Sequence, residues 1–277
     1  MRIKHGELPE AYIECFETLN AISQQAGLEY MLVGATARDL VIEHVYGISP
    51  IRRTYDIDIS IYIDSWEKFE GFKQLLCDSR FSLHPKVPHK LSFSPSKSQG
   101  ELQLDLVPFG AISDINGEIS WPPNFDSKMS VLGFAEAFQS KLLIDTNKEV
   151  IIPVISIEGL FLLKIIAWLD RNHEQRKKDA SDLCFIMTNY EHLEGMLETL
   201  FDEDCAGSYD FDLTKIAAAK LARKIKGICS SQTHEHITKN LLADNKQEIL
   251  EQLASEMSPN AEHNFTQLTI FKGTFTL

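Results

Sequence analysis

The chain has 277 residues, of which 44% are hydrophobic and 24% are charged, as is usual for a globular protein. Acidic residues outnumber basic ones by 40 to 27, and the resulting net charge of −13 argues against a broad, nonspecific nucleic-acid-binding surface. No apolar run reaches the roughly eighteen residues of a membrane span, and the N-terminus lacks a signal-peptide pattern, so we expect a cytoplasmic protein without membrane contact.

The first hundred residues alternate between helical and strand patterns. Helices are predicted over 8–27, 36–45 and 65–78, and strands over 30–33, 55–63, 81–84, 90–93 and 101–107. The strand over 55–63 shows strict alternation of apolar and polar side chains, which is typical of a sheet with one buried face. This order of elements predicts a mixed α/β domain.

The second half of the chain is mainly helical in pattern. Residues 111–155 give a weaker signal, with a strand or extended linker at 150–153. Helices are predicted over 156–170, 176–189, 192–202, 213–229 and 235–256, and 258–277 gives no clear signal. We therefore expect an α+β protein with a mixed-sheet domain over 1–110, a connecting segment over 111–155 and a helical C-terminal domain over 156–277.

Three aspartates lie in the predicted strands. Asp56 and Asp58 point to the same face of one strand, about 7 Å apart. Asp105, between two leucines of a later strand, joins them if the two strands are neighbours. Carboxylates that converge repel one another unless cations or protons neutralise them, and oxygen ligands of this kind suit Mg²⁺ or Mn²⁺. A set of carboxylates that holds two such ions is suited to nucleotidyl or phosphoryl transfer.

A corner of small residues, Gly34-Ala35-Thr36, separates the strand over 30–33 from the next helix. Backbone N–H groups at such a corner can approach phosphates, and the Thr36 hydroxyl can add a bond. Gly34 is equally explained by a tight turn and Thr36 by an N-cap. Arg38 is a candidate for phosphate contact, or pairs with an acidic neighbour on an exposed helix face.

Lys164 is the one charge between Glu158 and Asp170 in a helix that is apolar almost all round. A lysine in this setting extends to solvent or meets an anion. The histidines and cysteines show no zinc-site spacing, and neither a Walker A nor a His-Glu-x-x-His motif is present.

These motifs resemble those of a known superfamily. Gly34-Ala-Thr, Asp56-Ile-Asp58 and the lone Asp105 resemble the signature of polymerase-β-like nucleotidyltransferases, and Val33–Leu40 is also similar to a motif of tRNA nucleotidyltransferases. Within the superfamily the sequence is most similar to the AbiEii/MenT-type nucleotidyltransferase toxins, over about residues 30–190. Arg52-Arg53-Thr54, Lys164 in its helix, Arg171 and Lys178-Asp179-Ala-Ser-Asp182-Leu183 carry this second resemblance.

The resemblance implies a nucleotidyltransferase fold and a role for each matching residue. Asp56, Asp58 and Asp105 would bind two Mg²⁺ ions, and Lys164 would contact the nucleotide phosphates. Arg53, Thr54 and Asp179 would help to bind the nucleotide, although Arg53 is equally explained as a loop charge and Asp179 and Asp182 as a solvated helix start. The acceptor would be an RNA such as tRNA, a protein or a small molecule, and an antitoxin would be a partner.

Two other functions use the same residues. A metal-dependent phosphodiesterase or nuclease would direct the carboxylates at water, but has no need of a triphosphate-binding corner. A catalytically inactive member would keep the fold for nucleotide or partner binding. The sequence does not name the nucleotide base, because no motif encodes the contacts that select it.

Overall fold

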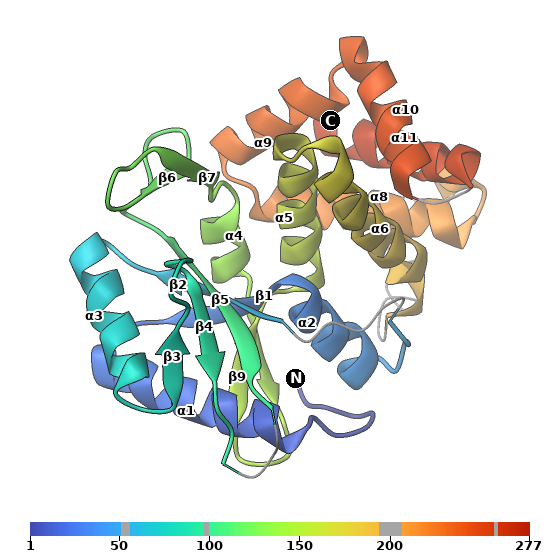
Figure 1. Cartoon of the computed structure of the whole chain (residues 1–277). Coiled ribbons are helices and arrows are strands. Elements are labelled where there is room, and N and C mark those ends of the chain that lie inside the picture. Colours follow the sequence, from blue (N-terminus) through green and yellow to red (C-terminus); the bar gives the residue numbers. More distant parts are fainter. Residues whose placement is uncertain (51–55, 97–99, 194–206, 258–259) are drawn as a thin grey trace. The chain divides into compact units, whose positions relative to one another are not determined.

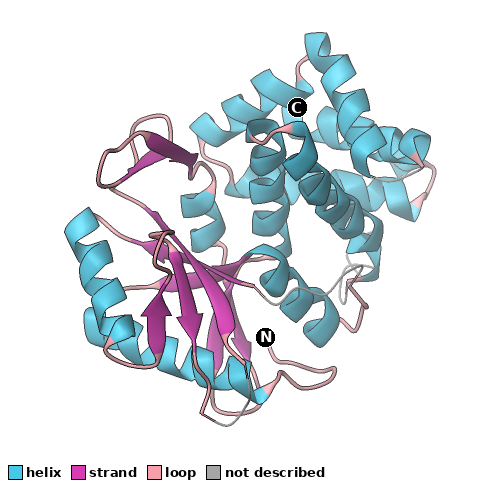
Figure 2. Cartoon of the chain, in the orientation of Figure 1, coloured by secondary structure: helices cyan, strands magenta, loops and turns pink. Residues whose placement is uncertain are grey.

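The computed structural model describes residues 1–50, 56–96, 100–193, 207–257 and 260–277. These residues form two compact units, Met1–Ser156 and Ile157–Leu277. Among the described residues, all strands lie in the first unit and the second consists of helices, as Figures 1 and 2 show. The predicted class, a mixed sheet followed by a helical part, is confirmed.

The first unit contains a mixed sheet of seven strands. Their spatial order is β3 (Phe81–Leu83), β4 (Lys90–Phe93), β5 (Leu102–Phe109), β2 (Ile57–Tyr62), β1 (Tyr30–Val33), β9 (Ile151–Val154) and β8 (Leu142–Asp145). The β2–β5 and β1–β9 pairs are parallel, and the other pairs are antiparallel. The first five strands lie where the sequence predicts them, within two residues at each end.

The central strand β2 has one buried face and one polar face. Ile57, Ile59 and Ile61 are fully buried, which explains the alternation in the sequence. Helices α1 (Glu10–Ala26) and α3 (Trp66–Cys77) pack against each other beside the sheet (Figure 1). The opposite face of β2 carries Asp58, which is partly exposed.

The segment that follows residue 110 also adds to this unit. It contains the hairpin of β6 (Glu118–Trp121) and β7 (Ser127–Ser130), then α4 (Phe134–Gln139), and then strands β8 and β9 of the main sheet. Pairing between β9 and β1 joins residues more than a hundred positions apart. Such long-range contacts leave little local pattern in the sequence, so the prediction for 111–155 found little more than the strand near 150–153.

The second unit holds six described α-helices: α5 (Ile157–Asp170), α6 (His173–Asn189), α8 (Leu213–Ile228), α9 (Ser231–Ile237), α10 (Gln247–Met257) and α11 (Ala261–Thr276). Between them lie the short 3₁₀ helices η2 (Tyr190–His192), η3 (Gly207–Tyr209) and η5 (Asp244–Lys246) and the π-helix η4 (Thr238–Leu242), which continues α9. The predicted helix over 235–256 is thus interrupted, and most of that over 192–202 lies outside the described residues. None of the described helices could cross a membrane.

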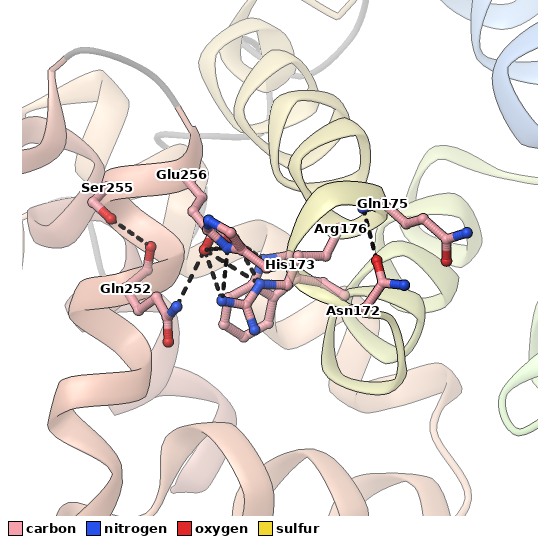
Figure 3. A network of polar contacts seen from close by, with 8 residues as sticks. Asn172, His173, Gln175, Arg176, Gln252, Ser255 and Glu256 are labelled. Atoms are coloured by element: carbon pink, nitrogen blue, oxygen red, sulfur yellow. Dashed lines mark hydrogen bonds and ion pairs between the residues drawn. The ribbon is translucent and has the colours of Figure 1, made fainter.

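A polar network joins α10 to α5 and α6 within this unit (Figure 3). The Glu256 side chain, only 7% exposed, accepts hydrogen bonds from Trp168 Nε1 at 2.9 Å and from Arg176 Nη2 at 2.8 Å. Arg176 also lies over the Trp168 ring, 5.0 Å from its centre. Burial raises the pKa of Glu256, but the bonds from Arg176 and Trp168 outweigh burial and lower it below its usual value.

Candidate active site

Two of the three predicted carboxylates are cross-strand neighbours. Strands β2 and β5 run parallel, and their register pairs Asp58 with Asp105. Residues in register on neighbouring strands point to the same face of a sheet, with strands roughly 4.8 Å apart. Both side chains lie on the polar face and are partly exposed. The sheet therefore holds two negative charges side by side at the surface.

Gly34 closes one side of this pair. It begins α2 (Gly34–Asp39), directly after β1, with a φ of +72°. A Cβ atom on residue 34 would lie 2.0 Å from Asp58 Oδ2, well inside the contact distance of two atoms. Both the backbone conformation and the close approach of Asp58 thus require glycine. The turn that the sequence predicts at Gly34 also leaves the space that the Asp58 carboxylate occupies.

Thr36 fixes the start of β2. Its hydroxyl donates to the backbone oxygen of Asp56 at 2.6 Å, and the side chain is 8% exposed. It makes no N-cap bond, because α2 begins after Val33 without a side-chain cap. A hydroxyl has one proton to donate, so in this arrangement it cannot also donate to a phosphate. The bond between α2 and Asp56 was not foreseen from the sequence.

Asp56 itself precedes β2 and is exposed. Within the described part of the chain, no three Asp, Glu, His or Cys side chains stand grouped as a ready metal site. The register of β2 with β5 thus brings together two of the three predicted metal ligands, Asp58 and Asp105. The participation of Asp56 as a third ligand stays a prediction.

A cation that the sequence analysis did not single out lies beside Asp105. Lys90 begins β4, which pairs with β5 so that Lys90 and Asp105 are in register. Lys90 Nζ lies 3.3 Å from Asp105 Oδ2. Strand alternation could have placed Lys90 on the polar face, but the pairing of β4 with β5 at this register is set by tertiary structure.

Other predicted contacts of the corner are less direct. The Arg38 guanidinium is 1% exposed and donates to Asp39 Oδ1 from Nε at 2.8 Å and from Nη2 at 2.6 Å. The predicted pairing with an acidic neighbour is present, but on a buried and not an exposed side chain. Ala35 is partly exposed. Arg53 and Thr54 lie outside the described residues, and phosphate contacts of all four stay predictions.

The second unit contains its own charged cluster. Lys164, on α5, lies 2.9 Å from Asp179 Oδ1 and 2.8 Å from Asp182 Oδ2. Arg171 Nη1 lies 2.8 Å from the other oxygen of Asp179. Both aspartates are at most 1% exposed, so they do not solvate a helix start. They are instead the buried anions that pair with Lys164. The positive charges of Lys164 and Arg171 together balance the two negative charges.

The comparison with protein families decides the identity. The model of the family "Nucleotidyl transferase AbiEii toxin, Type IV TA system" matches residues 24–270. This chain belongs to the AbiEii family. It is a nucleotidyltransferase, and the predicted resemblance is confirmed across both units. Membership of a type IV toxin–antitoxin family implies a nucleotide substrate and an antitoxin partner.

Solved structures give more distant likenesses to this AbiEii family member. An antigenic nucleotidyltransferase-like protein from Paracoccidioides brasiliensis is 18% identical, with a TM-score of 0.43, over 79% of this chain and 90% of the other. The antibiotic-resistance factor ANT(2'')-Ia is 13% identical, with a TM-score of 0.36, over 73% and 98%. A tRNA-processing enzyme is 12% identical, with a TM-score of 0.26, over 96% and 79%. No curated protein matches.

Proposed function

We propose that this AbiEii family member transfers a nucleoside monophosphate from a nucleoside triphosphate to a hydroxyl acceptor, in a reaction that depends on Mg²⁺ or Mn²⁺. The acceptor oxygen forms a bond to the α-phosphorus, the bond from that phosphorus to the β-phosphate oxygen breaks, and pyrophosphate leaves. The observation that supports this proposal is the register of β2 with β5, which sets Asp58 beside Asp105 against Gly34.

The residues present suit a divalent cation. Asp58 and Asp105 offer hard oxygen ligands side by side on one face of the sheet, the type of ligand that Mg²⁺ and Mn²⁺ prefer. Asp58, Asp105 and Asp56 would hold the ions. When bound, the ions lower the pKa of the attacking hydroxyl and neutralise the leaving phosphates. Gly34, which has no side chain, leaves room for the carboxylate of Asp58 beside the backbone, and Thr36 holds the start of β2 through the Asp56 carbonyl.

The remaining predicted roles belong to the same proposal. Lys164 is the candidate for contact with the nucleotide phosphates, and Asp179 is the candidate for orienting its ammonium group, which it already contacts. A tRNA end, a protein side chain or a small molecule would supply the acceptor hydroxyl. The net charge of −13 favours an acceptor that is engaged at few phosphates, because wide contact with RNA needs many cations.

The test is a labelling screen with the purified full chain. Each of the four NTPs, labelled at the α-phosphate, is incubated with Mg²⁺ and tRNA, cell extract protein or pooled metabolites. We expect labelled acceptor and one pyrophosphate for each transfer. Asp58→Asn should reduce transfer by at least about 100-fold, since it removes a ligand charge without changing the shape of the side chain. Asp64→Asn, at an exposed aspartate paired with Lys68, is the matched control and should leave transfer unchanged.

Two outcomes would overturn the proposal. Cleavage of a nucleic acid without release of pyrophosphate would indicate the phosphodiesterase or nuclease. No transfer by wild type to any acceptor, together with equal effects of wild type and Asp58→Asn on cell growth, would indicate an inactive member of the family.

A further inference from the structure

Lys90, Asp105 and Asp58 form a row across three neighbouring strands. β5 lies between β4 and β2, and both registers pass through Asp105, so the three side chains share one face of the sheet. The charges along the row are positive, negative and negative. Figure 1 shows the three strands side by side in the sheet.

The ammonium of Lys90 is placed to compete with a metal ion. It lies 3.3 Å from Oδ2 of Asp105, one of the carboxylates that would hold a divalent cation. Both side chains are partly exposed, 41% for Lys90 and 27% for Asp105, so solvent and ligands reach the pair. A lysine is a compact charge on a flexible stem, and it binds phosphates as well as carboxylates.

We propose that Lys90 serves as the counter-ion of Asp105 in the nucleotide-free protein and passes to the triphosphate when a nucleotide binds. The ammonium then disfavours a divalent ion that arrives alone and favours one that arrives with a triphosphate. Lys90 is thereby a residue that couples metal binding to nucleotide binding. This inference rests on the proposed function, because it takes Asp58 and Asp105 as metal ligands.

The competing view is that Lys90–Asp105 is an ordinary surface ion pair. Surface ion pairs contribute little to the stability of a protein. On this view, removal of the Lys90 ammonium would not change the binding of metal or triphosphate. The two views differ in the sign of their effects. A counter-ion that changes partners has opposite effects on the free metal and on the metal–triphosphate complex, whereas a surface pair has none and a damaged fold weakens both.

Binding of Mn²⁺ to the full chain tests the proposal without measuring transfer. Because the base is not known, inorganic triphosphate serves as the probe for the phosphate chain. Mn²⁺ alone and Mn²⁺–triphosphate are titrated by calorimetry, with free Mn²⁺ followed by electron paramagnetic resonance. The proteins are wild type, Lys90→Met, Lys90→Arg, Asp58→Asn and Lys68→Met, in which the last removes a lysine from an exposed ion pair of the same unit.

We expect Lys90→Met to bind Mn²⁺ alone about three to ten times more tightly, and Mn²⁺–triphosphate about three to ten times more weakly, than wild type. This is the size of effect expected for one charge about 4 Å from its partner when water screens the interaction almost fully. Lys90→Arg, which keeps the charge, and Lys68→Met should both resemble wild type.

Unchanged binding of both ligands to Lys90→Met, or a shift of both in the same direction, would overturn the role of Lys90. In that case the proposed function stands if Asp58→Asn loses Mn²⁺ binding. If wild type binds Mn²⁺ no better than Asp58→Asn, the metal site fails, and the role of Lys90 fails with it.

Discussion

At the scale of single residues, the most constrained position of the candidate site is a glycine. Gly34 combines a positive φ with a neighbour that leaves no room for a Cβ atom, whereas Gly27 has a similar φ of +63° and no atom within 4 Å of its Cβ position. Substitution of Gly27 would therefore cause backbone strain alone, whereas substitution of Gly34 would cause strain and also displace Asp58. In the sequence both are turn glycines, and nothing local shows that Gly34 is the more constrained.

We predict that Gly34→Ala lowers nucleotidyl transfer by at least about 100-fold, because the new methyl group displaces the carboxylate that would hold the metal. Gly27→Ala should cost about 1 kcal/mol in the free energy of unfolding, from strain in the left-handed conformation, and leave transfer intact. Steady-state kinetics and urea denaturation of both variants check this. Equal transfer rates for the two alanine variants would contradict it.

Lys164 has a structural role that is separable from its proposed chemical one. Lys164→Met leaves Asp182 and Asp179, both buried, without the ammonium group they share. We predict a loss of about 3 kcal/mol in the free energy of unfolding, the usual cost of removing one partner of a buried ion pair. Adding Asp182→Asn removes one of the two buried negative charges and should recover part of that loss.

The double variant decides between the two roles of Lys164. If Lys164 contacts the nucleotide, Lys164→Met/Asp182→Asn should regain stability and still fail to transfer. Recovery of transfer together with stability would show that the lysine is needed for the fold alone.

At the scale of elements, the helices of the second unit are held together by a buried acid as well as by apolar contacts. Glu256, on α10, receives hydrogen bonds from Trp168 on α5 and Arg176 on α6 (Figure 3). We predict that Glu256→Gln lowers the free energy of unfolding by about 1–3 kcal/mol, because bonds to a charged acceptor are replaced by weaker ones. Ser255→Ala, at an exposed neighbour on the same helix, should change it by less than about 0.5 kcal/mol. Urea denaturation compares the two.

How well an element could be predicted depended on where its contacts lie in the sequence. The sequence predicts strand β2 because its apolar and polar residues alternate, even though the polar Ser60 is itself buried. Helix α11 was missed because Asn264 and Gln267 are buried on it among apolar residues, so polarity no longer marks its exposed side. The sequence does not predict the interruption between α9 and α10. At Ala243 the backbone becomes extended between η4 and η5, but the apolar residues on either side keep a nearly helical spacing.

The candidate site divides in the same way. Asp58 and Asp105 could be proposed from the sequence because each lies between apolar residues in an alternating strand. Their register could not, since it depends on which strands become neighbours. The pairing of Lys90 with Asp105 and the bond from Thr36 to the Asp56 carbonyl also depend on tertiary structure and have no local signal in the sequence.

At the scale of the whole molecule, the family match over 24–270 spans both compact units. The candidate carboxylates belong to the first unit and Lys164 to the second. The stability of each unit therefore bears on the proposed reaction. In the first unit, a tertiary contact that involves none of the candidate carboxylates can be tested by varying the pH.

Glu14 joins α1 to the segment around β3 and β4. Its carboxylate is 7% exposed, accepts bonds from the backbone N–H of Ser96 at 2.8 Å and from the Ser96 hydroxyl at 2.7 Å, and pairs with Arg80. These bonds, led by the one from the Ser96 backbone, lower the pKa of Glu14 from 4.5 to about 2. A folded-state pKa below the unfolded one means that the stabilisation is complete above about pH 4.5 and is lost as the pH falls towards 2.

We therefore predict that Glu14→Gln unfolds at lower urea concentration than wild type at pH 7, and that the difference between the two narrows steadily between pH 4.5 and pH 2. The matched control is Glu17→Gln, an exposed glutamate on the same helix, which should follow wild type at every pH. Comparing variants at each pH cancels the titration of the other carboxylates, which acid affects equally in all three proteins. A difference between Glu14→Gln and wild type that stays constant as the pH falls would mean that the packing of the side chain, and not its charge, holds α1 in place.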